Sequence, residues 1–245
     1  MKKLLALLFL AGVAHAGTIT TSFAPLGTIT FSSGTAAAGG GSPLAFVQAT
    51  STASTDGGCG SVLNTITVAA GDLLVLGCAT TANFSGITPT DASDSWLTAG
   101  SSITGSNFIG IWYVKSAVGG ATTVTAATGG CNGVNYCVLA EYSGQNTSTT
   151  FDVFSASAPV ATGINPLTTL AATTTGTNEL MFSIAWADAS GAITSQTGTS
   201  RYAGGANPYL YAQDANIPTS TVYISTWNQT SPFDWMAAQA AFNHQ

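Results

Sequence analysis

The sequence predicts an all-β protein, an antiparallel two-sheet β-sandwich of jelly-roll-like type. Short runs rich in β-branched and aromatic residues recur along the chain, and Gly, Pro, Asn, Asp and Ser separate them. No stretch of ten or more residues combines helical periodicity with capping residues. Short strands at spacings of about 8 to 15 residues, without crossover helices, favour two antiparallel sheets packed face to face.

The N-terminus has the three parts of a secretory signal peptide. Lys2 and Lys3 precede an apolar run at residues 4–13, which ends in the small-residue site Ala-His-Ala. We expect cleavage after Ala16 and export of the remaining chain to the outside of the cell or its surface. The apolar run is shorter than the roughly 20 residues that span a bilayer, so membrane insertion is not expected.

Residues 17–42 are predicted to form a lead or linker ahead of one β-sandwich domain at residues 43–245. The lead contains two short alternating pieces, 18–22 and 28–31, and ends in the run TAAAGGGS. Regular alternation of strands and turns begins at Pro43. About 225 mature residues are enough to bury one sizeable core as a single domain.

The domain is divided into predicted strands by its turn residues. In chain order they are 44–48, 64–68, 73–79, 96–99, 108–115, 122–127, 136–142, 152–155, 167–171, 179–187, 200–203, 209–214, 221–228 and 235–242. We expect a central hairpin between 122–127 and 136–142. The second of these strands is apolar on both faces apart from Glu141, so it should lie inside a sheet. The last run is rich in alanine, but a closing strand is expected because a sandwich must protect its edges.

Charge is scarce in this chain. The formal net charge is −6, and loss of the signal peptide leaves Lys115 and Arg201 as the basic residues against ten acidic ones. Binding to nucleic acid or to an anionic membrane surface is therefore not expected. Positive mean hydropathy and repeated β-branched runs indicate a folded core.

The cysteines are Cys59, Cys78, Cys131 and Cys137. An even number in an exported chain favours disulfides over a metal site. Three pairings are possible, and we prefer the local one, Cys131 with Cys137 and Cys59 with Cys78. No metal and no cofactor is predicted, because neither spacing is CxxC and the mature chain has almost no His.

Six motifs follow one another in a definite order. They are GDLLV at 71–75, the segment 91–96, IWYVK at 111–115, AEYSG at 140–144, NELMF at 178–182 and the segment 234–242. In this order they resemble a β-sandwich module recurrent in secreted bacterial proteins, often beside other extracellular modules. The resemblance covers about residues 44–242. It implies a fold and an extracellular setting, but no particular activity.

Nucleophilic catalysis with a histidine base is disfavoured. His15 leaves with the signal peptide, His244 is the penultimate residue, and no G-x-S-x-G elbow is present. Glycoside hydrolysis remains the alternative function, because it requires two carboxylates that flank a groove. The chain has two glutamates, Glu141 and Glu179, which are the catalytic candidates under this alternative.

The motif ELMF that begins at Glu179, followed by Trp186, resembles the nucleophile strand of one family of jelly-roll endoglucanases. The match departs from that family, because the Trp is displaced and no Glu follows where the family places its acid. Asp188, Asp214 or Asp234 could take the place of that acid.

Both glutamates also have structural interpretations. Glu179 follows a turn, where a strand-start carboxylate accepts backbone hydrogen bonds. Glu141 is expected to be exposed or paired with Lys115 or Arg201, because a buried unpaired carboxylate is costly.

Aromatic rings and Asn side chains suit a sugar-binding surface when they are exposed. Trp112, Trp186 and Trp227 lie mid-strand among apolar neighbours and are predicted to fill the core. A loop containing Gly and Pro offers better candidates. The predicted ligand-binding residues are Tyr202, Asn207, Tyr209 and Tyr211.

Asp91 and Asp94 are residue types that can bind calcium, but their spacing is that of an ordinary Asp-containing turn. We therefore expect a turn here and not a calcium site. The sequence thus predicts a non-catalytic exported module that binds an extracellular polysaccharide or cell-surface glycan, or has a structural role at the surface. The glycoside-active enzyme is the alternative. A self-assembling surface protein is a third possibility, and it requires long exposed edge strands.

Overall fold

The computed structural model describes nine ranges of the chain with side chains for nearly all residues. They are 43–54, 62–80, 86–128, 135–144, 151–157, 165–187, 193–203, 210–230 and 234–243. Only the backbone is described for 19–23 and 27–31, and for residues 53, 54, 62–64, 128 and 203. The described part of the chain consists of strands and turns without a helix, which confirms the all-β prediction.

The chain forms two compact units, Met1–Gly39 and Gly40–Gln245. The first unit contains a hairpin of β1 (Ile19–Phe23) and β2 (Gly27–Phe31), which pair antiparallel. These strands match the two alternating pieces that the sequence predicts in the lead.

The second unit contains the other strands. The first set is β3 (Ala45–Ser54), β4 (Val62–Val68), β5 (Leu73–Thr80), β6 (Ile87–Thr90), β7 (Leu97–Thr104), β8 (Asn107–Val114), β9 (Gly120–Thr128) and β10 (Asn135–Ser143). The second set is β11 (Phe151–Ala156), β12 (Leu167–Thr168), β13 (Ala172–Thr173), β14 (Glu179–Ala187), β15 (Ile193–Ser195), β16 (Thr199–Ala203), β17 (Leu210–Ile217), β18 (Val222–Tyr223), β19 (Thr226–Gln229) and β20 (Trp235–Phe242). The sequence analysis missed β6, β13 and β15, ended β3 and β7 too early, and predicted β18 and β19 as one strand. The bounds of the remaining strands are close to the predicted ones.

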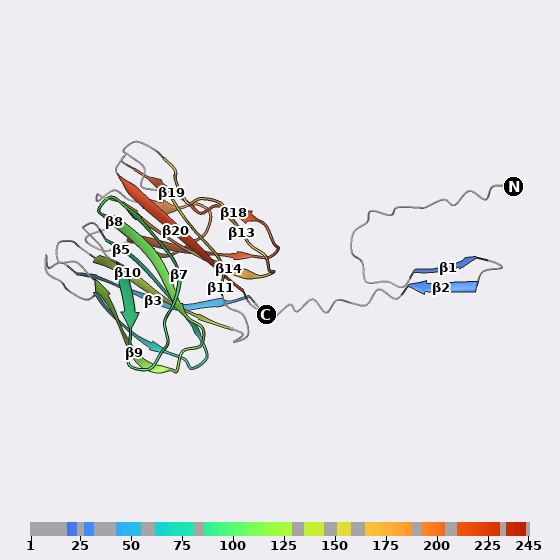
Figure 1. Cartoon of the computed structure of the whole chain (residues 1–245), viewed down its shortest axis with the longest axis horizontal. Coiled ribbons are helices and arrows are strands. Elements are labelled where there is room, and N and C mark those ends of the chain that lie inside the picture. The colour runs from blue at the N-terminus through green and yellow to red at the C-terminus, as the bar shows by residue number, and fades with distance from the viewer. Residues whose placement is uncertain are drawn as a thin grey trace. The chain divides into compact units, whose positions relative to one another are not determined.

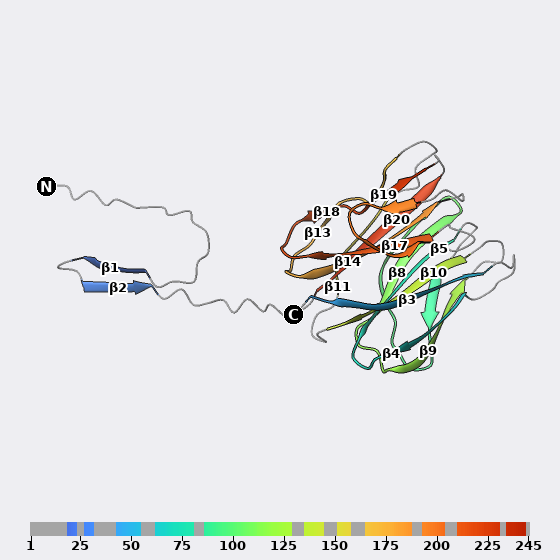
Figure 2. The same cartoon turned by 180° about the vertical axis from the view of Figure 1, so that it is seen from behind.

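The strands of the second unit form four layers (Figure 1). The first central sheet has the order β3-β10-β5-β8-β7, and the second central sheet has the order β11-β20-β14-β17-β16. The first outer sheet, β4-β9-β6, covers the far face of the first central sheet. The second outer layer, made of β12-β19-β15 and β13-β18, covers the far face of the second, as the view from behind also shows (Figure 2).

The same topology occurs twice in these layers. We call residues 43–144 the first half and residues 151–243 the second half. In the second half we count β12 and β13 as one strand, and β18 and β19 as one strand, so that each half has eight strands. In each half the first strand then pairs with the last, the second with the seventh and the third with the sixth, as in a jelly roll. The predicted jelly-roll-like sandwich is therefore present, but as two halves whose central sheets face each other.

Local details of the backbone repeat as well. The third strand of each half follows a residue with positive φ, Gly71 at 93° and Asn178 at 55°. The N–H of Gly71 donates to the carbonyl of Ala117, and the N–H of Asn178 donates to the carbonyl of Pro218. These positions fix which residues of the two halves are equivalent.

All four edge strands of the central sheets are irregular. The pairing register shifts within β3, β7, β11 and β16, whereas the pairing of β5 and β14 with their neighbours is continuous. Bulges at sheet edges hinder the addition of further strands.

Three kinds of core hold the layers together. The two central sheets bury a continuous apolar core between them, which contains Tyr142, Phe182, Trp186 and Phe242. Each central sheet also buries a core against its outer layer. Strand β10 is buried on both faces, which confirms the prediction that it lies inside a sheet.

Two predicted pairings are wrong for the same reason. Strands β9 and β10 do not form a hairpin, because β9 belongs to the first outer sheet and β10 to the first central sheet. Cys78 and Cys137 face each other on β5 and β10 and form a disulfide, so the predicted local pairing of cysteines is wrong. Cys59 and Cys131 lie outside the described residues.

Candidate functional site

A hollow of about 280 Å³ opens in the first half, between the turn before β7 and the segment after β8. Its walls come from residues 93–97 and 114–118, which the pairing of β7 with β8 brings side by side. The lining residues are Ser93, Asp94, Ser95, Leu97, Val114, Lys115, Ser116 and Val118.

Asp91 organises the turn that forms one wall. Its Oδ1 accepts hydrogen bonds from the N–H groups of Ser93 (2.8 Å) and Asp94 (2.6 Å), and its Oδ2 accepts one from the Trp96 indole (2.9 Å). This is the Asp-containing turn that the sequence predicts. The turn places the Asp94 side chain beside the segment after β8.

Asp94 joins the two walls. Its Oδ1 accepts a hydrogen bond of 2.8 Å from the Val118 N–H. Burial raises the pKa of Asp94, the Val118 N–H lowers it, and the nearby Asp91 carboxylate raises it. The carboxyl group of Asp94 is therefore held in place in the lining of the hollow.

The remaining walls combine exposed polar groups with aliphatic surface. Lys115 and the hydroxyl groups of Ser95 and Ser116 are exposed. Leu97 and Val118 are 39% and 60% exposed and provide apolar surface beside them. One carboxyl group, one ammonium group and several hydroxyl groups thus surround a small space with apolar edges, which is typical of sites that orient a polar small molecule.

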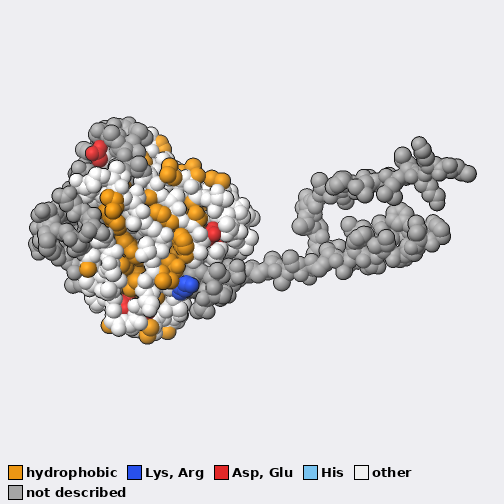
Figure 3. Space-filling model, viewed as in Figure 1, with side chains coloured by type: hydrophobic (Ala, Val, Ile, Leu, Met, Phe, Trp, Pro, Cys, Tyr) orange, Lys and Arg blue, Asp and Glu red, His pale blue; other side chains and the backbone are white. Residues whose placement is uncertain are grey.

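The described surface drawn in Figure 3 is poor in charge. Apolar and uncharged polar side chains cover the face drawn in Figure 3, and acidic or basic side chains occur there singly. Long-range electrostatic attraction therefore contributes little to binding on this face, and local hydrogen bonds and contacts must provide specificity.

The second half does not repeat the charges of the hollow. The pair Leu97 and Tyr113 of the first half is equivalent to the pair Thr199 and Asp214 of the second half. Counting from these pairs, Gln196 is the equivalent of Asp94, and Asn216 is the equivalent of Lys115. In the second half the hydroxyl of Tyr223 donates to the Thr197 carbonyl (2.6 Å). The hollow with its acid and its amine is therefore a feature of the first half.

The structure does not support the predicted aromatic platform. Tyr211 is 4% exposed and belongs to the core under the second outer layer, so the prediction of an exposed ring is wrong there. Tyr202 is half-buried against the central core. Asn207 and Tyr209 lie outside the described residues. Trp112, Trp186 and Trp227 are buried, as predicted.

Glu141 and Glu179 do not form a catalytic pair. Glu141 lies on the face of the first central sheet that packs against the first outer sheet, where Leu139 also points. Glu179 lies on the face of the second central sheet that packs against the second outer layer, where Met181 also points. The central core separates the two carboxyl groups, so the predicted groove between them is not formed.

Glu141 is buried, at 1% exposure, and its predicted pairing with Lys115 or Arg201 is wrong. Its Oε1 accepts from the Ala69 N–H (2.7 Å) and its Oε2 from the Gln48 amide (2.6 Å). Its carboxyl group also lies beside that of Asp72, which comes two residues before Leu74, the partner of Glu141 on β5. Neutral donors and a second acid therefore surround Glu141.

Glu179 accepts a hydrogen bond from the backbone N–H of Gly176, which confirms the prediction for a strand-start carboxylate. It is 0% exposed, and its carboxyl group is in contact with that of Asp152. A side chain at position 176 would collide with Glu179 and Asn243, which explains the glycine there.

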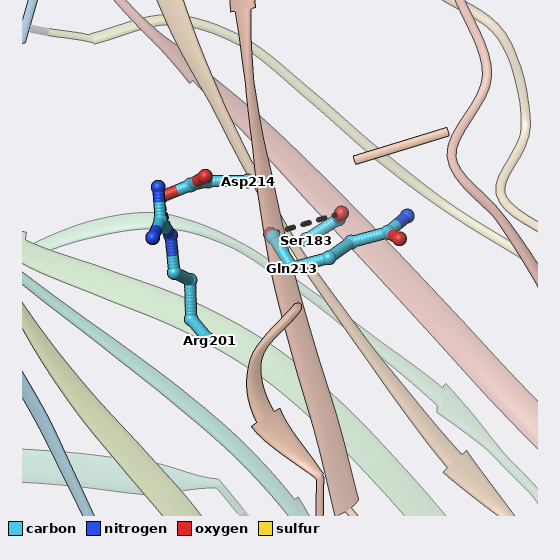
Figure 4. Close-up of polar contacts among 4 residues, drawn as sticks. All are labelled: Ser183, Arg201, Gln213 and Asp214. Atoms are coloured by element: carbon cyan, nitrogen blue, oxygen red, sulfur yellow. Dashed lines mark hydrogen bonds and ion pairs between the residues drawn. The ribbon is translucent and has the colours of Figure 1, made fainter. Parts of the chain in front are cut away.

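Arg201 pairs with Asp214 instead of a glutamate (Figure 4). Its Nε donates to Asp214 Oδ2 at 2.7 Å, and its guanidinium lies 4.1 Å from the centre of the Phe46 ring. Phe46 belongs to β3 and Arg201 to β16, so this contact joins the two halves at one rim of the central sheets. Gln213 and Ser183 lie on the other side of β17 in the same view.

Sequence reasoning missed Asp72, Asp152 and the hollow. A signal for the first exists, because Gly71-Asp72-Leu73-Leu74 and Asn178-Glu179-Leu180-Met181 have the same pattern of turn residue, acid and two apolar residues. No comparable signal marks the hollow, because its two walls are adjacent only in the folded chain.

Two searches of the described residues bear on other kinds of site. They contain no group of three or more His, Cys, Asp and Glu side chains that could hold a metal ion. They also contain no helix with the length and apolar character needed to cross a membrane. Comparisons with protein-family models, curated proteins and solved structures found no match to this chain.

Proposed function

We propose that the protein is an exported, non-catalytic binding module and that the hollow of the first half holds a hydroxyl-rich saccharide. The observation that carries this proposal is the convergence of Asp94, Lys115 and serine hydroxyl groups on one space of about 280 Å³. Carboxyl groups accept, and ammonium groups donate, hydrogen bonds to the hydroxyl groups of a sugar. Leu97 and Val118 provide surface for its aliphatic face.

The size of the hollow limits the ligand. Small-molecule sites occupy about 300 to 1,000 Å³, so this hollow is at the small end and suits one or two sugar rings at the end of a chain. The lining contains one acidic side chain, Asp94, and one basic side chain, Lys115, and this balance of charge favours a neutral sugar.

Export is supported by the signal-like N-terminus and by the resemblance to secreted modules. The Cys78–Cys137 disulfide is compatible with an oxidising compartment. The alternatives receive less support. The carboxyl groups of Glu141 and Glu179 lie on separate faces, and the bulged edge strands disfavour growth of the sheets into fibres.

The test is a glycan-array screen of the mature protein, followed by calorimetry on the best glycan. We expect Asp94→Asn and Lys115→Gln each to weaken binding at least about tenfold, which corresponds to about 1.4 kcal/mol. The amide introduced by Asp94→Asn retains an acceptor for the Val118 N–H, so the turn should remain folded. The matched control is Asn216→Ala at the position equivalent to Lys115, which should leave binding unchanged.

Two outcomes would contradict the proposal. Absence of binding to every glycan would remove the saccharide as ligand. Binding that survives both hollow variants but is lost in Tyr209→Ala would place the site in the loop that the sequence analysis favours.

A further inference from the structure

Carboxyl groups contact one another at several places in a chain that has few charges. Asp72 lies beside Glu141, which pairs with Leu74 two residues further along, and Asp152 and Glu179 accept from the adjacent N–H groups of Thr175 and Gly176. A further contact joins the turn residue Asp91 to Asp94. Two ionised carboxylates in such contact repel each other strongly when they are buried, so a proton or a cation must lie between them.

The two pairs occupy related places in the fold. Asp72 and Glu179 are equivalent, because each directly follows the positive-φ residue, Gly71 or Asn178, that precedes the third strand of its half. Their partners come from different neighbours, Glu141 from β10 and Asp152 from β11. The acid at the beginning of the third strand is thus the common feature.

The groups around each pair suit a proton better than a metal ion. Glu141 accepts from the Ala69 N–H and the Gln48 amide. Asp152 accepts from the N–H (2.8 Å) and the hydroxyl (2.6 Å) of Thr175. A calcium ion requires six to eight oxygen ligands, whereas these neighbours present hydrogen atoms toward the carboxyl groups. In each pair, one ionised carboxylate can accept hydrogen bonds from these donors, and the protonated partner acid can donate its O–H to the same carboxylate. This arrangement accounts for these contacts around the pair.

We propose that each half holds one proton between its two acids, Asp72 with Glu141 and Glu179 with Asp152, so that the fold is most stable in mildly acidic surroundings. Asp72 and Glu179 carry the protons, since Glu141 and Asp152 each accept two hydrogen bonds from N–H or hydroxyl donors, whereas Glu179 accepts one at Oε1 and its Oε2 is buried without such a donor.

The titration of the two acids supports this assignment. Burial, together with the contact to Glu141, raises the pKa of Asp72 to about 6. Burial raises the pKa of Glu179 to about 7, with Gly176 lowering it and Asp152 raising it. A folded-state pKa above the unfolded one means that the folded protein binds more protons. This stability is fully present below the unfolded pKa and is lost as pH rises through about 6 and 7.

The other charged groups near the pairs do not neutralise them. The segment after β8 packs against the first pair through the bond from the Ala117 N–H to the Asp72 carbonyl, and it carries Lys115. Within the described ranges the one salt bridge is Arg201 with Asp214, so neither Lys115 nor Arg201 forms an ion pair with these acids. Gly176 and Asn243, which lie beside Glu179, do not titrate.

The experiment measures unfolding by urea from pH 5 to pH 8 for the mature protein and for the double variant Asp72→Asn, Glu179→Gln. The amide N–H groups of Asn and Gln imitate the protonated acids. We expect the unfolding equilibrium constant of the wild type to rise at least about tenfold between pH 5 and pH 8, and that of the double variant to change much less. Gln196→Asn, at an exposed position, is the control and should follow the wild type.

Infrared spectra provide a second readout that does not depend on stability. The wild type should show absorption of buried protonated carboxyl groups at pH 6, and the double variant should lack it. A wild-type stability that is constant or increases up to pH 8 would overturn the proposal. Stabilisation by millimolar calcium at pH 8, abolished by the double variant, would show that the pairs bind a cation instead.

Discussion

The two halves of the protein share a topology but differ in the core beneath their outer layers. In the first half Leu76 pairs with Trp112 on one side and Leu139 on the other, so an apolar row crosses the central sheet. The equivalent row of the second half consists of Ser183, Gln213 and Gln239. The same strand pairing is therefore compatible with an apolar and with a polar row.

The polar row explains why the second outer layer is split. Gln239 is buried and donates to the carbonyls of Leu170 (2.9 Å) and Tyr223 (3.0 Å), while Ser225 donates to its Oε1 (2.8 Å). Leu170 lies between β12 and β13, and Ser225 lies between β18 and β19. The carbonyls of Leu170 and Tyr223 thus receive their hydrogen bonds from the Gln239 side chain instead of from a neighbouring strand.

The disulfide marks a second difference between the halves. Cys78 and Cys137 face each other on β5 and β10, and the equivalent pair on β14 and β20 is Ala185 and Ala237. The disulfide closes a loop of 59 residues, for which chain-entropy models give about 4 kcal/mol of stabilisation. The second half depends on hydrogen bonds and apolar packing at the same place.

Replacing a core residue of one half by its equivalent from the other half should lower the stability of the protein. We expect Gln239→Leu, which introduces the residue found at the equivalent position 139, to lower the free energy of unfolding by about 3 kcal/mol. The cause is that the carbonyls of Leu170 and Tyr223 lose their buried donor. Urea denaturation measures the effect, and Gln196→Leu at an exposed position is the control, with an expected change within about 0.5 kcal/mol.

A Gln239→Leu variant as stable as the wild type would break the comparison. It would mean that the hydrogen bonds of Gln239 contribute nothing net and that the row tolerates either chemistry in either half.

Exchange at the repeated turn should succeed. Gly71→Asn introduces the residue type found at the equivalent position 178, and the site has open space for a side chain. Asn tolerates positive φ, so we expect a loss of about 1 kcal/mol or less, against about 2 kcal/mol for Gly71→Val, whose branched side chain resists this conformation. Thermal unfolding compares the two variants. Equal losses for Asn and Val would contradict the equivalence of the two turns.

Strand positions could be predicted from the sequence because a short apolar or β-branched run bounded by turn residues is a local property. The runs that became β5, β10, β14 and β20 were found with bounds close to the observed ones. Strand partners could not be predicted in the same way, because a jelly roll pairs strands that are far apart in the sequence. The expected hairpin and the expected disulfides both assumed that neighbours in sequence are neighbours in space.

The candidate site was predictable only in part for the same reason. The Asp91 turn is local, and the sequence predicted it correctly. Lys115 reaches the hollow only because β7 and β8 pair. Tyr211 was expected to be exposed, but its place in β17 turns the ring under the second outer layer.

The register of β5 against β10 is the part of this architecture that chemistry can test most directly. Mass-spectrometric mapping of the non-reduced mature protein should yield a peptide in which Cys78 is linked to Cys137. A map that links Cys131 to Cys137 or Cys59 to Cys78 would contradict the central-sheet register and, with it, the equivalence of the two halves.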